Sequence, residues 1–184
     1  MATAKTGSFY LTETVTLAPA SAASSRTQGV VDLGAYVNVP TGQAIAIESV
    51  DFIYQQTSEY AGGPVATMLA ANGALTVQLT DLNPGTGFVR ADDQSLIASA
   101  AMNIDTAANI ATHTSDLYPD NFGPTNMSEA FMVVNDSLYL VCGNDDAAVG
   151  ANALYITARI RCRVVKLSQQ DWMAIAIQST ASDN

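Results

Sequence analysis

Charged side chains are scarce in this sequence. Only 13% of the 184 residues are Asp, Glu, Lys or Arg, about half the share found in an average soluble domain. Because surface charge keeps protein molecules apart and is costly to bury in a contact, this composition suits a molecule whose outside is covered by neighbours. A protein with a plain neutral surface has the same composition, since interfaces and free surfaces overlap in residue content.

Basic residues are the scarcer of the two charged classes. Seven Lys and Arg stand against 17 Asp and Glu, so the net charge is −10 and the isoelectric point is near 4.1. This balance excludes electrostatic binding of nucleic acid over the whole surface. A local basic patch remains compatible with such a contact. The acids are scattered rather than gathered in blocks, which argues against a disordered acidic tail.

Residues that carry catalysis are also few. The single histidine, His113, cannot build the sites of two or three histidines that catalytic zinc and iron favour, and no Gly-x-Ser-x-Gly elbow supports a serine nucleophile. Gly85-Thr-Gly87 lacks the third glycine and the strand-to-helix context of a phosphate loop. The sequence therefore predicts a protein that is not an enzyme, with no catalytic residue, no bound cofactor and His113 in a solvated loop.

Two pairs of adjacent acids are the only candidates for a metal site. Asp92-Asp93 and Asp145-Asp146 fall in predicted loops, where carboxylates and carbonyl oxygens can hold a hard cation such as calcium. Neither pair matches an EF-hand loop, and paired acids in β turns are more often solvated. Calcium is kept as the lesser alternative.

Long apolar runs are missing. The first residues lack the apolar core of a signal peptide, and no stretch approaches the roughly 20 apolar residues needed to span a bilayer. We expect a soluble product without a membrane-spanning segment. Cys142 and Cys162 lie on predicted strands and could face each other, but in a chain without an export signal two buried thiols are favoured over a disulfide.

What the sequence does contain is alternation of apolar and polar residues, which is typical of half-buried strands. Pro40-Thr-Gly42 predicts a hairpin turn between two of these strands, and a parity change at Glu48 and Ser49 predicts a β-bulge. The predicted strands are Phe9–Leu17, Val31–Val39, Gln43–Gln55, Leu75–Thr80, Ser95–Ile104, Phe131–Val134, Ser137–Cys142 and Leu154–Val165.

The remaining segments complete the fold prediction. Residues 106–128 have no clear period and predict a long irregular loop. Ser168 to Asp171 resembles a capping box, and Trp172, Ile175 and Ala176 predict one apolar side of a short helix. The expected fold is all-β: a single jelly-roll or Greek-key β-sandwich of about eight strands with a short C-terminal helix, over residues 1–184 as one domain.

The last predicted strand carries the most specific feature, a stripe of Arg159, Arg161 and Arg163 on one face. One explanation is a solvated face whose arginines pair with acids on adjacent strands. Another is a docking surface for an acidic patch of a neighbouring subunit, since arginine is the charge most compatible with interfaces. A nucleic-acid contact is the third and is not favoured. We adopt the inter-subunit interface as the prediction.

Two segments resemble virion structural proteins of viruses that infect environmental, particularly marine, microbes. They are residues 31–55, running through Pro40-Thr-Gly42, and residues 154–168 with the following Trp172. The resemblance implies a jelly-roll subunit that assembles into the virion shell, as a major capsid protein in preference to a cement or decoration protein. It further implies synthesis in the host cytoplasm, and copies of itself and other virion proteins as partners.

A ligand-binding β-sandwich, such as a carbohydrate-binding module, is the alternative function. Tyr54, Tyr60 and Tyr118 are the candidate stacking platform for sugar rings, because aromatic faces bind the apolar faces of sugars. Such modules usually accompany other domains or a secretion signal, neither of which is evident. The capsid function is therefore preferred.

Overall fold

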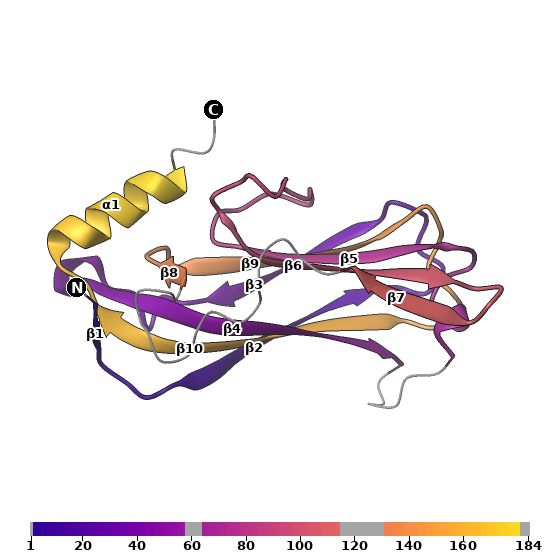
Figure 1. The fold of residues 1–184 in the computed structure, drawn as a ribbon, viewed down its shortest axis with the longest axis horizontal. Helices are drawn as coiled ribbons and strands as arrows, with labels where there is room; N and C mark the ends of the chain where they lie inside the picture. Colours follow the sequence, from indigo (N-terminus) through magenta and orange to yellow (C-terminus); the bar gives the residue numbers. More distant parts are fainter. Residues whose placement is uncertain (1, 58–63, 115–130, 181–184) are drawn as a thin grey trace.

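The computed structural model describes residues 2–57, 64–114 and 131–180. Two antiparallel sheets lie face to face, and a single helix stands at one end of the sandwich (Figure 1). The strands are β1 (Thr3–Ala4), β2 (Phe9–Leu17), β3 (Arg26–Asp32), β4 (Gln43–Gln56), β5 (Gly73–Thr80), β6 (Leu96–Asp105), β7 (Ile110–Thr114), β8 (Phe131–Val133), β9 (Ser137–Asp145) and β10 (Leu154–Lys166). Short 3-10 turns η1 (Val39–Thr41) and η2 (Val65–Thr67) and helix α1 (Gln169–Thr180) complete the described elements.

The order of strands in the two sheets is that of a jelly roll. The first sheet runs β2–β10–β4–β8, with β1 continuing the β2 edge along the end of β10, and the second runs β3–β9–β5–β6–β7. From β2 to β5 the chain changes sheet at every strand, and its last long strand lies between β2 and β4. The predicted jelly-roll β-sandwich with a short C-terminal helix is confirmed, and β7 adds one strand to the second sheet.

The core forms because each sheet turns its alternate apolar residues inward. On β10 the even positions from Leu154 to Val164 are buried, while Arg159 on the other face is exposed. Cys142 on β9 and Cys162 on β10 belong to this core as free thiols. Burial raises the pKa of both thiols, and the nearby Glu48 carboxylate adds to the effect on Cys162, whose pKa is about 12. Neither thiol is therefore a nucleophile in the folded chain.

The predicted strand Val31–Val39 is wrong, and of the predicted hairpin only the turn at Pro40-Thr-Gly42 is present, where Asn38 and Gln43 form an antiparallel bridge. The strand β3 ends at Asp32, and the chain then turns, with the Tyr36 and Val37 amides donating to the Leu33 carbonyl at 2.8 and 2.9 Å. Strands β3 and β4 lie in different sheets, so this segment is a corner between sheets. The alternation was misleading because Leu33, Tyr36 and Val37 pack against the core from turns as well.

Two further predictions have opposite outcomes. The bulge is confirmed: β4 shifts register against β10 between Arg161 and Cys162, so Glu48 is the extra residue. The loop expected around His113 is partly a strand, since β7 pairs with β6 and places His113 opposite Met102. Residues 115–130, including Tyr118, lie outside the described residues.

Helix α1 covers the outer face of the first sheet at its end. The Asp171 amide donates to the Ser168 hydroxyl at 3.1 Å, which is the predicted cap. Trp172, Ile175 and Ala176 pack on a small second cluster of residues buried against the sheet. That cluster consists of Ala44, Ala46, Val134, Val165 and Leu167. Together these contacts bury the odd position Val165, which would otherwise face solvent.

Candidate functional site

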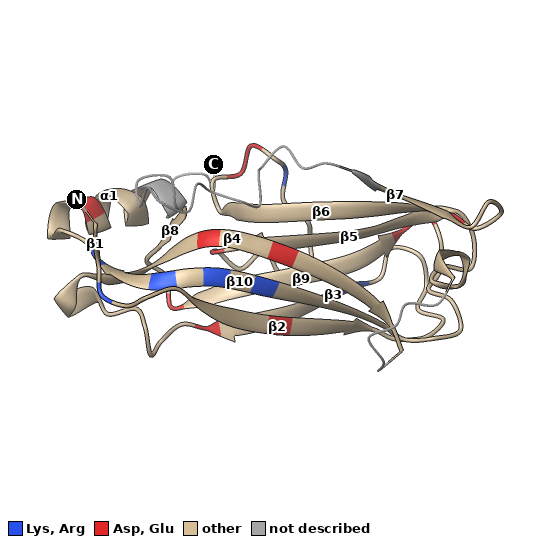
Figure 2. Ribbon diagram, turned by 60° about the horizontal axis from the view of Figure 1, so that its bottom comes forward, with Lys and Arg blue, Asp and Glu red and all other residues tan. Residues whose placement is uncertain are grey.

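The three predicted arginines lie in a row on the outer face of the first sheet, on its central strand β10. Figure 2 shows this basic row with the acidic positions of β4 beside it. Strand pairing sets Arg159 opposite Asp51 and Arg161 opposite Ser49 on β4. The structure therefore brings the predicted residues together on one face, and it adds acidic neighbours to them.

Glu48 is the centre of this group and was not identified as a functional candidate from the sequence. Its carboxylate is 2% exposed and accepts Arg161 Nε at 3.0 Å and a guanidinium nitrogen of Arg163. The Ser8 hydroxyl donates to the same carboxylate, at 2.9 Å to Oε2 and 3.1 Å to Oε1. The bulge explains this geometry, because the extra residue lets an acid reach two arginines that are two positions apart on the neighbouring strand.

Arg159 has a different neighbour. Its guanidinium carbon lies 4.9 Å from the ring centroid of Tyr10 on β2, a cation–π distance. Cross-strand pairing with an acid thus describes Arg161 and Arg163, and aromatic stacking describes Arg159. The inter-subunit role of the stripe stays a prediction, with Arg159 exposed and the Arg161 side chain 41% exposed.

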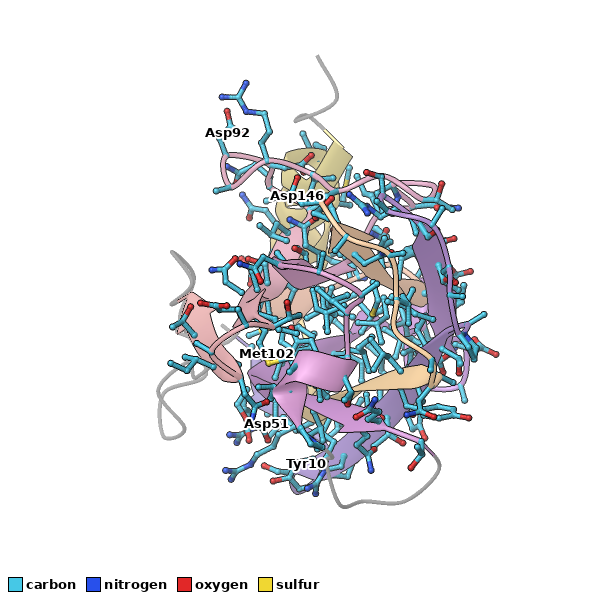
Figure 3. The ribbon with its side chains drawn as sticks, turned by 90° about the vertical axis from the view of Figure 1, so that its right-hand side faces the viewer. Tyr10, Asp51, Asp92, Met102 and Asp146 are labelled. Atoms are coloured by element: carbon cyan, nitrogen blue, oxygen red, sulfur yellow. The ribbon has the colours of Figure 1, made fainter. Side chains whose placement is uncertain are left out.

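Past Arg159 and Asp51, toward the end of β10 away from α1, the described outer face of the first sheet carries no charged residue. Thr14 and Thr157 share a hydroxyl hydrogen bond of 2.9 Å, and Tyr155 pairs with Thr16 on one side and Gln55 on the other. We call this surface the threonine face. It consists of Thr14, Thr16, Ile53, Gln55, Tyr155 and Thr157, none of which is fully buried. Figure 3 shows Tyr10 and Asp51 on this side of the sandwich and Asp92 on a loop at the opposite side.

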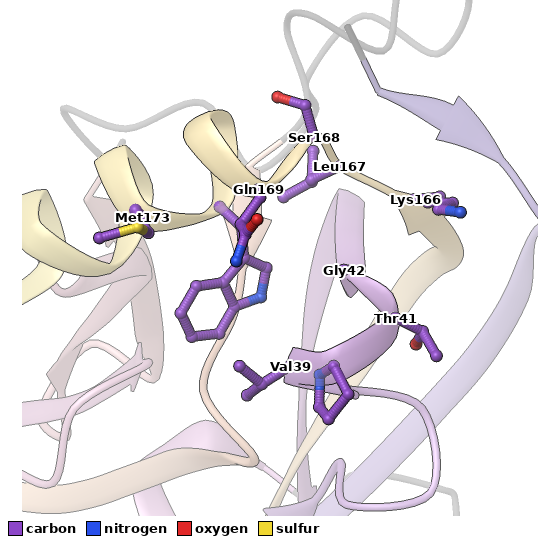
Figure 4. Close-up of a pocket in the computed structure, with 10 residues that line it drawn as sticks. Val39, Thr41, Gly42, Lys166, Leu167, Ser168, Gln169 and Met173 are labelled. Carbon is purple, nitrogen blue, oxygen red and sulfur yellow. The ribbon is translucent and has the colours of Figure 1, made fainter.

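The second surface of interest is a groove at the α1 end of the sandwich. It has a volume of about 760 Å³ and lies between the turn η1 and the beginning of α1 (Figure 4). Its apolar lining comes from Val39, Pro40, Leu167, Trp172 and Met173. Val39 is 60% exposed and Met173 is 55% exposed. The groove is thus an open apolar surface.

Of the four acids proposed for calcium, three have structural partners, and the exposed Asp92 lies 3.6 Å from Arg90 Nε. Asp145 forms an ion pair with Arg26, whose guanidinium also lies 4.5 Å from the Phe88 ring centroid. Asp93 accepts the Ser95 amide and hydroxyl at 2.8 and 2.7 Å. Within residues 2–57, 64–114 and 131–180, no group of three or more His, Cys, Asp or Glu could hold a metal ion. Calcium therefore stays an untested alternative.

The proposed stacking platform is not assembled by the described residues. Tyr54 is on β4 and packs against the core, so it does not present an open face. Tyr60 and Tyr118 lie outside the described residues. In the part of the chain that the structure describes, Tyr10 is the tyrosine most open to solvent, at 51%. Across the same part, no helix is long and apolar enough to cross a membrane.

Comparison with known proteins gives structural likeness alone. No protein-family model and no curated protein matches the sequence. Merkel cell polyomavirus VP1 in complex with GD1a oligosaccharide is 12% identical, with a TM-score of 0.41 over 90% of this chain and 99% of that chain. Trichodysplasia spinulosa-associated polyomavirus VP1 in complex with GM1 oligosaccharide is 8% identical, with a TM-score of 0.42 over 86% and 96%. At these values the jelly-roll assignment rests on the strand order of this chain itself.

Proposed function

We propose that this chain is a non-enzymatic structural subunit of a virion shell. In this proposal it self-assembles as a major capsid protein, in preference to acting as a cement or decoration protein. Jelly-roll sandwiches are used by viral capsid and lectin domains alike, and a fold by itself does not decide between them. The origin in a virus of environmental microbes, and synthesis in the host cytoplasm, rest on the resemblance of residues 31–55 and 154–168.

The observation that carries the proposal is the low charge of the outer surfaces. The threonine face crosses three strands without a charged residue, and large apolar side chains are exposed at the α1 end. Neutral side chains lose less hydration on contact than charged ones. Large exposed apolar patches are typical of interaction surfaces. Both features favour a molecule that is covered on more than one side.

The ion-pair cluster of Glu48, Arg161 and Arg163 supports the same function because it makes the outer face of the first sheet rigid. Glu48 ties β10 to β4 and, through Ser8, to the segment before β2. A buried carboxylate with several charge-assisted hydrogen bonds holds these elements in one register. A shell subunit needs such a fixed outer face, because its neighbours contact it at defined positions.

Sedimentation velocity of the purified chain over a hundredfold range of concentration tests the proposal. A discrete oligomer or a closed particle whose fraction of the protein increases with concentration supports a shell subunit. A chain that remains a monomer throughout this range, with a cooperative unfolding transition showing that it is folded, contradicts self-assembly.

The threonine face also favours one second candidate, a carbohydrate-binding sandwich. Hydroxyl groups of Thr14 and Thr157 lie in the open beside Tyr155, and sugars are bound by such polar groups next to an aromatic ring. Binding of immobilised glycans by a monomer, lost in Tyr155→Ala but kept in Tyr36→Phe, would support this candidate over the shell subunit.

A further inference from the structure

We propose that the α1 end is one half of a head-to-tail contact between two copies of this chain. The α1 end is defined here by Val39, Lys166, Leu167, Met173 and Ile177. The other half is an acidic surface on β3 of the second copy. This inference rests on the proposed function, since it assigns residues to the contacts of a self-assembling subunit.

Helix α1 is apolar on two sides, and one of them packs on the sheet. Trp172, Ile175 and Ala176 pack on the sheet, whereas Met173 is 55% exposed and Ile177 is 62% exposed. Met173 and Ile177 are four residues apart, so they lie next to each other on the helix surface. A helix that only covered its own sheet would carry polar residues at these positions.

The exposed apolar residues are concentrated at this end. Of the six large hydrophobic side chains exposed in the described residues, three belong to the α1 end: Val39, Met173 and Ile177. Val39 and Met173 both line the groove of Figure 4. The result is one continuous apolar surface formed by a turn and a helix, rather than isolated side chains.

Charge indicates what covers this surface. Five of the seven basic residues lie on β10 or beside it, namely Lys5, Arg159, Arg161, Arg163 and Lys166. Lys5 and Lys166 are exposed, and Lys166 lines the groove. Because the whole chain has a net charge of −10, the rest of its surface is acidic. Asp171 is the one charged residue of α1, so with Lys5 and Lys166 the α1 end keeps a small positive excess. It therefore complements the acidic surfaces of other copies better than a second α1 end.

The outer face of β3 matches the α1 end in both polarity and charge. On the outer face of β3, Val30 is 49% exposed and stands two residues from exposed Asp32. Asp32 pairs with Ser137, which brings exposed Asp136 next to it. Neither Asp32 nor Asp136 has an ion-pair partner among the described residues. An apolar side chain beside two carboxylates fits an apolar groove whose lining includes Lys166.

The two surfaces differ, so the contact is heterologous, and this limits the assemblies that it can form. Repetition of a heterologous contact closes into a ring when the rotation per subunit allows it, and otherwise forms an open filament. A two-fold dimer through the α1 ends is the arrangement that charge disfavours.

Sedimentation velocity of the full chain and its variants tests the contact. Ile177→Glu should weaken assembly at least tenfold while the melting temperature of the monomer is unchanged, because the side chain is exposed. Ile110→Glu is the matched control, since Ile110 is 53% exposed but lies on β7. Assembly of Ile177→Glu at the wild-type concentration overturns the inference and leaves the proposed function standing. A wild-type chain that never associates overturns both.

A charge exchange identifies the partner surface. Lys166→Glu and Asp32→Lys should each weaken assembly, and the double variant should recover most of it, because the ion pair is restored with its signs reversed. Losses in the double variant that equal the sum of the two single losses would overturn the pairing of β3 with the α1 end. Salt should weaken the wild-type contact.

Discussion

Replacing the buried carboxylate of Glu48 by an amide is the most informative single change to the fold. Glu48→Gln keeps the volume of the side chain but removes the charge that holds Arg161, Arg163 and the Ser8 hydroxyl. The amide nitrogen is a donor and would face a guanidinium donor. At least one of the two arginines then loses its acceptor at a site where Glu48 is 2% exposed.

The loss of stability in Glu48→Gln depends on how deeply the ion-pair cluster is buried. Removing one partner of a fully buried ion pair costs about 3–5 kcal/mol, whereas a surface pair contributes about 0–1 kcal/mol. The Arg163 side chain is 20% exposed and that of Arg161 is 41% exposed, so the cluster falls between these limits. We expect Glu48→Gln to lower the free energy of unfolding by about 2–3 kcal/mol.

Urea denaturation followed by tryptophan fluorescence and circular dichroism measures this change. Asp51→Asn is the control, because Asp51 is an exposed acid on the same face of β4, and its loss should cost less than about 0.5 kcal/mol. Both variants are compared at several protein concentrations, since association also stabilises the folded state. A Glu48→Gln variant as stable as Asp51→Asn would show that the ion-pair cluster does not hold the sheet together.

Three further results follow from the packing. Gly150→Ala should cost about 1–3 kcal/mol, because a Cβ there would overlap a backbone carbonyl oxygen; Gly7→Ala, with nothing within 4 Å of its Cβ, should be near neutral in the same thermal melts. Burial raises the pKa of Glu13 above its ordinary 4.5, so the folded state favours the neutral acid and the charged form destabilises it. Glu13→Gln should therefore be more stable than wild type at neutral pH, and the difference should vanish below about pH 4; a constant difference across pH would exclude this cause. Cys142 and Cys162 should resist iodoacetamide at pH 8 until the chain is unfolded, because burial raises the pKa of both thiols; rapid labelling of the folded chain, detected by mass spectrometry, would contradict their burial.

Much of the fold follows from local patterns because half-buried strands impose strict alternation. The strands containing Thr14 and Arg161, and the bulge at Glu48, were all predictable in this way. The corner after Asp32 was not, since Leu33 and Val37 keep the spacing of a strand while turns fold them onto the core. Alternation records which side chains are buried, and a turn can bury the same side chains.

The candidate site was less accessible to sequence reasoning than the fold. The stripe of arginines was visible, but its partner Glu48 is more than 100 positions away, and only the pairing of β4 with β10 joins them. The outward side of α1 could have been found from Met173 and Ile177, which share a face at a spacing of four. Trp172 and its neighbours form the inward side, so apolar residues on both sides of α1 obscure a single amphipathic pattern.

Electron microscopy of the purified full chain tests the central claim most directly. A shell subunit with complementary surfaces should form rings or closed particles of uniform size, and these should be absent from Ile177→Glu and present in Ile110→Glu. Uniform folded monomers of the wild-type chain at high concentration and low salt would contradict the account.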